Sequence, residues 1–181
     1  MVNDGLASAQ CRGIIVRQMR ASDIPGVARA HIAAWRVAFR GILSDRTLDG
    51  LRVEHFEGAW QEIIQRENRT NLVAEQGGEI LGYVAFGPTH DLQDDARPPG
   101  EIYGIYVHPD HWRVGAGRSL MSQALKQLRG QGFTRVIVWT MAGNAISRGF
   151  YEKNRFVLDG GERTSERGGE RFQELVFTRA L

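Results

Sequence analysis

Residues 101–120, EIYGIYVHPDHWRVGAGRSL, carry more structural information than any other part of the chain. The first half is apolar and aromatic, as expected for a buried strand, and Pro109 ends that strand. Gly115 and Gly117 follow, and Leu120 begins an apolar pattern with helical spacing. Such a strand–loop–helix segment leaves unpaired backbone N–H groups at the positive end of a helix dipole. Phosphate groups bind at sites of this kind.

Two known phosphate loops do not fit this segment. A P-loop requires GxxxxGK followed by Ser or Thr, and no lysine follows these glycines, which excludes it. A Rossmann loop requires GxGxxG after the first strand of a βαβ repeat. Here Leu120 occupies the third glycine position and the strand lies in the middle of the chain. By itself, the segment is also compatible with a flexible helix start that binds nothing.

On either side of this segment, the hydrophobic period alternates between two, typical of strands, and about 3.6, typical of helices. Residues 88–100 contain three prolines and are expected to form a mobile surface flap. The other predicted elements are a strand at 13–19, helices at 22–40 and 53–64, a hairpin at 71–87, a loop and helix within 110–132, a strand at 134–141, a helix at 144–154 and a hairpin from 156 to 179.

Length and composition indicate one globular domain. The chain has 181 residues, of which 42% are hydrophobic and 24% charged, so intrinsic disorder is excluded for most of it. We expect residues 1–12 to be a disordered extension and residues 13–181 to form a single domain. Cys11 is the only cysteine, which excludes an internal disulfide and a cysteine-based zinc site.

Charge and hydropathy indicate which partners to expect. There are 23 basic and 21 acidic residues, a net charge of +2, and they are intermixed, so no nucleic-acid partner is predicted. The first twelve residues lack the apolar core of a signal peptide, and no apolar run approaches the ~20 residues of a membrane helix. We therefore expect a cytoplasmic protein without a membrane partner.

A second informative segment is GNAISRGFYEKNRF, residues 143–156, in which Asn144 and Tyr151 lie two helical turns apart on one face. With this segment the chain resembles the GNAT superfamily of acyl-coenzyme A N-acyltransferases. HPDHWRVGAG is similar to the family's pyrophosphate loop, Q/RxxGxG/A, and NAISRGFYEKNRF is similar to its later NxxAxxxYxxxGF helix. The motifs occur in the family's order, and the resemblance covers residues 14–178.

The resemblance implies a layered α/β (α+β) fold. Its central sheet is mixed and mostly antiparallel, with about seven strands, a splayed motif strand and about four flanking helices. It also implies acetyl-CoA as co-substrate, a primary amine of a small molecule or peptide as acceptor, direct transfer in a ternary complex and no metal. Homodimer formation is expected from family habit only. The alternatives are a catalytically inactive coenzyme A-binding sensor and an interaction module.

Carried over residue by residue, the resemblance implies which groups bind the coenzyme. Asn144 would hydrogen-bond the pantetheine arm, and Tyr151 would lie at the sulfur. The edge of the motif strand at Ile105, Tyr106 and Val107 would pair with the same arm as an added strand does. The pyrophosphate would be held by Arg113 and by the backbone of Val114, Gly115, Ala116, Gly117, Arg118 and Ser119.

The chain departs from the family motifs at two positions. Trp112 stands where the family usually has glutamine or arginine, so a side-chain phosphate contact would be lost or would shift to Arg113. Arg155 replaces the glycine before Phe156. Because asparagine tolerates the left-handed conformation, Asn154 is expected to take that turn.

The same resemblance supplies candidates for the chemistry. A phenol beside the sulfur can protonate the departing thiolate, which makes Tyr151 the candidate general acid. Glu101 is the favoured base, with His108 as its rival. A metal pair of His108 and His111 lacks a third ligand nearby.

The acceptor is poorly encoded in the sequence. Trp35 and Phe39 lie where the family's variable acceptor-binding region falls, and they are the predicted substrate-binding residues. Helical aromatics are more often core residues, so the acceptor amine is not named at this point.

Overall fold

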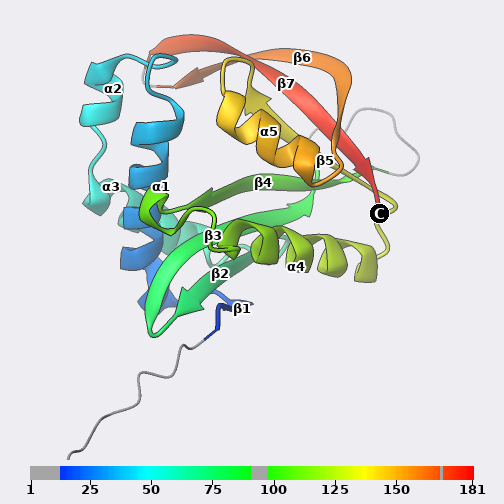
Figure 1. The fold of residues 1–181 in the computed structure, drawn as a ribbon, viewed down its shortest axis with the longest axis horizontal. Coiled ribbons are helices and arrows are strands. Elements are labelled where there is room, and N and C mark those ends of the chain that lie inside the picture. The colour runs from blue at the N-terminus through cyan, green and yellow to red at the C-terminus, as the bar shows by residue number, and fades with distance from the viewer. Residues whose placement is uncertain (1–12, 91–97, 168) are drawn as a thin grey trace, which may run out of the picture.

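The structure is a computed structural model that describes residues 13–90, 98–167 and 169–181. Within these residues the chain forms one seven-stranded sheet with the order β1-β2-β3-β4-β5-β7-β6 (Figure 1). The strands are β1 (Ile15–Gln18), β2 (Thr70–Gln76), β3 (Glu79–Pro88), β4 (Gly100–Val107), β5 (Arg135–Met141), β6 (Val157–Arg167) and β7 (Glu170–Ala180). The helices are α1 (Ile24–Ala38), α2 (Asp45–Asp49), α3 (Val53–Ile63), α4 (Ala116–Gly130) and α5 (Ala145–Lys153).

The predicted mixed sheet of seven strands is confirmed, and there is one α-helix more than expected. The additional helix is α2, which lies where the sequence predicts only a break between two helices. Ser44 caps it, because the Ser44 hydroxyl accepts a hydrogen bond from the Thr47 backbone N–H at 3.2 Å. The predicted extension at 1–12 and residues 91–97 of the predicted flap lie outside the described residues.

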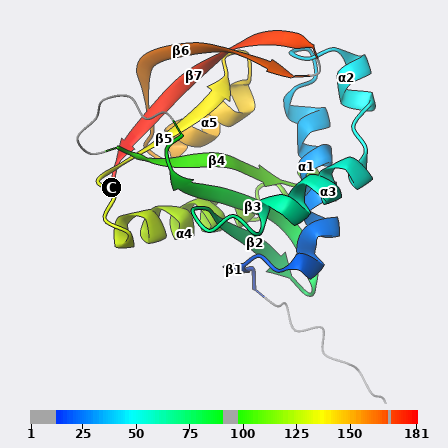
Figure 2. The same ribbon diagram turned by 180° about the vertical axis from the view of Figure 1, so that it is seen from behind.

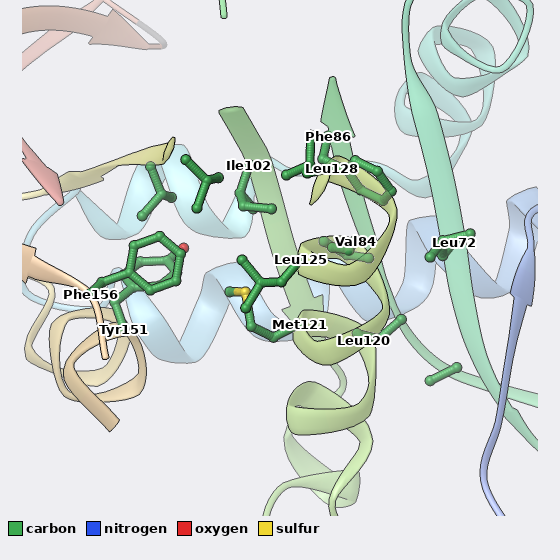
Figure 3. Packing of buried hydrophobic residues seen from close by; sticks show 14 of the residues in the cluster. Leu72, Val84, Phe86, Ile102, Leu120, Met121, Leu125, Leu128, Tyr151 and Phe156 are labelled. Carbon is green, nitrogen blue, oxygen red and sulfur yellow. The ribbon is translucent and has the colours of Figure 1, made fainter. Parts of the chain in front are cut away.

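The helices cover the two faces of the sheet. Helices α4 and α5 lie on one face and α1 and α3 on the other (Figures 1 and 2). The larger core cluster is on the α4 side, where Leu120, Met121 and Leu128 pack against Ile102 and Phe86 (Figure 3). Among the described residues, no helix is both long enough and apolar enough to cross a bilayer.

Strand β4 separates from β5 after three residue pairs. The two strands run parallel and pair only from Gly100 with Val136 to Ile102 with Val138. On its other side β4 continues to pair with β3 up to Val107. A bulge at Tyr103 interrupts that pairing and turns the strand away from β5. The sheet therefore opens between β4 and β5, and the second half of β4 presents a free edge there.

Candidate active site

The free edge of β4 exposes the backbone of alternate residues. The His108 N–H donates to the Leu81 carbonyl on β3 at 2.8 Å. Because backbone groups alternate sides along an antiparallel strand, Tyr106 also turns its backbone toward β3. Ile105 and Val107 turn theirs toward the gap. The sequence predicts all three residues as the binding edge, whereas the structure leaves Ile105 and Val107 in that position.

Trp112 shares part of this edge. Its indole N–H donates to the Val107 carbonyl at 2.8 Å. Of the groups that face the gap, the Val107 N–H and both backbone groups of Ile105 have no hydrogen-bond partner in the described parts of the chain. Trp112 therefore caps the end of β4.

The start of α4 presents backbone N–H groups beside the gap. Arg113 and Gly115 have positive φ angles of 66° and 99°, which turn the loop into the helix. The Ser119 N–H donates to the Gly115 carbonyl at 3.0 Å and so belongs to the first helical turn. Only the N–H groups before it, up to that of Arg118, are left to bind an anion. The predicted backbone contact from Ser119 is therefore not available, although its hydroxyl remains.

Gly117 has a packing role that the sequence does not reveal. A Cβ atom there would lie 3.2 Å from Phe150 Cε2 on α5 and 3.7 Å from Val107 Cγ2 on β4. By contrast, nothing lies within 4 Å of a Cβ placed on Gly115. Gly117 therefore allows the first turn of α4 to approach α5 closely, whereas Gly115 is required for its backbone conformation.

Asn144 lies buried at the N-terminus of α5. Its Oδ1 accepts a hydrogen bond from the Ser147 N–H at 3.0 Å and caps the helix. Its Nδ2 makes no hydrogen bond to any described residue. One side chain thus fixes the start of α5 and keeps a donor for a ligand.

Tyr151 is buried between the sheet and α5, where its ring packs against Phe156 and Phe177 at centroid distances of 5.8 and 6.2 Å. Figure 3 shows it beside Phe156, across from Ile102 and Met121. Burial raises the pKa of the Tyr151 phenol, and the nearby Tyr106 phenol raises it further. Tyr106 belongs to the α1 face of the sheet.

The two candidate bases lie at opposite ends of β4. Glu101 is buried where β4 still pairs with β5, and its Oε2 accepts hydrogen bonds from the Thr89 hydroxyl at 3.0 Å and the His90 N–H at 3.2 Å. It lies four residues, about 13 Å of extended strand, from Ile105. His108 is half-buried beyond the other end of β4, and its Nδ1 accepts from the Asp110 N–H at 3.3 Å. Glu101 therefore does not contact an amine at the gap directly, and a proton would reach it through a chain of waters.

A metal site at His108 and His111 has no further ligands. The two rings are 5.7 Å apart, and His111 Nε2 lies 3.1 Å from Glu79 Oε1. In the described ranges, no three side chains of His, Cys, Asp or Glu are placed to share a metal ion.

A cavity of about 850 Å³ opens on the α1 face. Trp35, one of the two predicted substrate-binding residues, lines it. Phe39 does not, because it is buried against Trp35, Leu43 and Met141. The other lining residues come from α2 and the residues that flank it, from α3 and from the hairpin of β6 and β7: Ser44, Arg46, Thr47, Gly50, Leu51, His55, Phe56, Arg167 and Glu170. Phe56 lies on a predicted apolar face, but no sequence pattern places Arg167 above Trp35.

The end of α5 differs from the sequence prediction. Arg155, and not Asn154, takes the left-handed conformation, with a φ angle of 63°. The Phe156 N–H donates to the Tyr151 carbonyl at 3.0 Å and the Arg155 N–H to the Glu152 carbonyl at 2.9 Å, the pairing of a Schellman motif. The helix therefore ends as a glycine-terminated helix would, at the cost of strain in Arg155.

The sheet opens between two parallel strands, and a helix N-terminus with unpaired backbone N–H groups lies at the opening. This is the arrangement of the acyl-coenzyme A N-acyltransferases. Residues 30–156 match the sequence profile of the Acetyltransferase (GNAT) family. The chain belongs to this family.

Relatives support this assignment over most of the chain. It is 33% identical over 150 residues to the "Probable N-acetyltransferase Rv2775" of Mycobacterium tuberculosis, covering 81% of this chain and 82% of the relative. It is 29% identical over 146 residues to the "L-amino acid N-acyltransferase MnaT" of Escherichia coli, covering 79% of each. The crystal structure of the PaiA N-acetyltransferase of Thermoplasma acidophilum in complex with coenzyme A has the same fold. Its TM-score is 0.75 at 16% identity, with 93% of this chain and 99% of that chain covered.

Proposed function

We propose that the protein transfers an acetyl group from acetyl-CoA to the primary amine of a small molecule in a ternary complex. The observation that carries this proposal is the free edge of β4, which leaves Ile105 and the Val107 N–H unpaired beside the core cluster that contains the buried Tyr151. An extended amide-containing arm can pair with that edge as an added strand does.

The residues around the gap suit coenzyme A. The backbone N–H groups at the start of α4 provide donors for a pyrophosphate, and the helix dipole favours its charge. Ile105, Val107 and the Nδ2 of Asn144 offer hydrogen bonds to the pantetheine amides. These are three separate sets of unpaired groups along one path from α4 to Tyr151.

The reaction requires two proton transfers. The amine nitrogen attacks the thioester carbonyl carbon, so a C–N bond forms and the C–S bond breaks. We assign Glu101, through a chain of waters, as the base that accepts the proton lost by the amine. We assign Tyr151 as the acid that protonates the departing thiolate, and an unpaired N–H of β4 as the donor that polarises the carbonyl.

The acceptor would enter through the cavity on the α1 face, because the coenzyme occupies the α4 side of the sheet. Glu170 in this cavity is already engaged, since it accepts hydrogen bonds from Ser44 at 2.7 and 3.0 Å and another from Thr47. Arg46 and Arg167 form no ion pair with a carboxylate in the described residues, and Arg167 lies 5.1 Å from the Trp35 ring. These charges favour an amine that also carries a carboxylate, in agreement with the name of the E. coli relative.

The test is thiol release from acetyl-CoA in the presence of an amine panel. Amino acids should be paired with their amides, and polyamines, aminoglycosides and peptide N-termini should be included. We expect turnover, faster with free amino acids than with their amides. Coenzyme A binding without turnover on any amine would instead favour a coenzyme-binding sensor, and absence of coenzyme binding would favour an interaction domain.

A further inference from the structure

Glu170, at the start of β7, joins the hairpin of β6 and β7 to α2. Its carboxylate accepts hydrogen bonds from the Ser44 hydroxyl at 2.7 Å, from the Ser44 backbone N–H at 3.0 Å and from the Thr47 hydroxyl. The donors belong to the first turn of α2 and to the residue that caps it. We call these contacts the Glu170 clasp. The three residues line the cavity on the α1 face, so the clasp lies at that cavity.

The clasp depends on an ionised group. Hydrogen bonds from Thr47 and Ser44 hold the pKa of the Glu170 carboxyl below its usual value. The carboxylate is therefore charged at neutral pH, and hydrogen bonds to a charged acceptor are stronger than those between neutral groups. Thr47 and Ser44 lie 123 and 126 residues before Glu170 in the chain. The clasp therefore fixes the hairpin relative to the helical side of the cavity.

Arg167 depends on the same hairpin for its position. Arg167 and Glu170 are directly opposite each other in the β6–β7 ladder, so their side chains leave the same face of the hairpin. From that face Glu170 reaches α2, and the Arg167 guanidinium lies 5.1 Å from the centroid of the Trp35 ring on α1. A cation–π contact at an exposed position is weak, so it does not by itself determine where a flexible side chain lies. The place of the guanidinium therefore depends on the clasp.

We propose that Glu170 is a positioning residue for the acceptor: it fastens the hairpin to α2 and so keeps Arg167 over Trp35, where the carboxylate of the acceptor amine binds. This inference rests on the proposed function, which names an amine that also carries a carboxylate. The clasp has a second effect on such an acceptor. Without its three donors, the Glu170 carboxylate would be free to turn into the cavity and repel the carboxylate of the acceptor.

Glu170→Asp is the variant that tests the clasp. Aspartate keeps the negative charge, but its side chain is shorter by one methylene group, so we expect it to lose hydrogen bonds to α2. Glutamine would be less informative, because it also removes a charge from the cavity. The matched control is Glu166→Asp, an exposed residue of the same hairpin whose Oε2 lies 3.6 Å from Arg171 Nε. Thr47→Val tests the clasp from its other side, because it removes one donor and leaves Glu170 unchanged.

The first measurement is amide hydrogen exchange of the full chain, followed by NMR. The Ser44 N–H donates to Glu170, so it should exchange about tenfold faster or more in Glu170→Asp and at the wild-type rate in Glu166→Asp.

The second measurement is steady-state kinetics with free amino acids and their amides. In Glu170→Asp the KM for the free amino acid should rise about tenfold, equivalent to about 1.4 kcal/mol, with a smaller rise in Thr47→Val. The kcat, the KM for the amide and the affinity for coenzyme A should change by less than about twofold, because only binding of the carboxylate is lost. A general loss of folding would instead affect both acceptors equally.

The outcomes separate this inference from the proposed function. If the wild type transfers acetyl groups but Glu170→Asp keeps the same preference for free amino acids, the proposed function stands and the positioning role of Glu170 is refuted. If the wild type acetylates no amine, the proposed function fails, and hydrogen exchange still decides whether Glu170 holds the hairpin. Unchanged exchange of the Ser44 N–H in Glu170→Asp would overturn the clasp itself.

Discussion

Replacement of Tyr151 by phenylalanine isolates the chemistry of the phenol from its packing. The ring contacts with Phe156 and Phe177 are retained, and no described residue hydrogen-bonds the hydroxyl, so nothing is left unpaired. Loss of a general acid typically lowers kcat by 10² to 10⁴-fold, equivalent to about 2.7–5.4 kcal/mol. For Tyr151→Phe we expect a decrease in kcat at the lower end of this range, about 100-fold. A thiolate with a pKa of ~8.5 can leave without full protonation, and burial makes the Tyr151 phenol a weaker acid than usual.

The assay measures steady-state thiol release alongside coenzyme A binding and thermal unfolding. Coenzyme A affinity should change by less than about threefold, since the phenol acts on the leaving group. Tyr103→Phe is the matched control, because it removes a hydroxyl from the paired side of β4, where it donates to the Pro88 carbonyl. Because the pKa of Tyr151 is raised above about 10, kcat should show no loss from this group between pH 7 and 9.5. Undiminished turnover in Tyr151→Phe, in a folded protein, would refute the assignment.

Three other perturbations follow from the structure. Glu101→Gln should lower kcat at pH 7 by about 100-fold or more while coenzyme A binding is unchanged. If raising the pH by one unit restored kcat, the base would instead come from the solvent. Gly117→Val should push against Phe150 and weaken coenzyme A binding. The control Gly130→Val, on the same helix, should not weaken binding, because a Cβ there meets nothing within 4 Å. Equal effects of the two variants would show that the contact with Phe150 is unimportant. Burial lowers the pKa of His31 to about 3, so the unfolded chain takes up a proton below about pH 6.5 that the folded chain refuses. Denaturant unfolding should therefore lose about 1.4 kcal/mol per pH unit between pH 6 and 4 beyond the loss seen in His31→Phe, and parallel pH slopes for the two proteins would contradict this.

Periodicity was sufficient to predict the order of strands and helices, because each element has one apolar face. It did not predict α2, a five-residue helix too short to show a period, which depends on the cap by Ser44 and on hydrogen bonds from Ser44 and Thr47 to Glu170. These contacts join segments more than 120 residues apart. No local pattern contains that information.

The sequence motifs predicted which segments form the candidate site. They did not predict which side of β4 each backbone group faces or where each side chain packs. Family motifs identified the β4 edge and the start of α4, but the pairing of β3 with β4 determines that Tyr106 turns its backbone away from the gap. The resemblance to the family indicated both Trp35 and Phe39 for the acceptor region. Only tertiary packing shows that Phe39 is covered by Leu43 and Met141. Neither the family motifs nor a residue pattern indicated Arg167. The hairpin that contains it is polar throughout, so its sequence does not predict the register of the two strands.

The four residues from Tyr103 to Tyr106 connect the gap in the sheet with the α1 face. The bulge at Tyr103 separates β4 from β5 and so creates the gap. A Cβ atom at Gly104 would lie 2.9 Å from the Tyr106 ring. Because glycine lacks this atom, the ring can pack closely over the strand. From there the centroid of the Tyr106 ring lies 4.6 Å from that of His31 on the α1 face, and the Tyr106 phenol raises the pKa of Tyr151. Because one short segment both opens the sheet and fills the space between its two faces, a change in the packing of Tyr106 should affect acceptor binding and the leaving-group acid together.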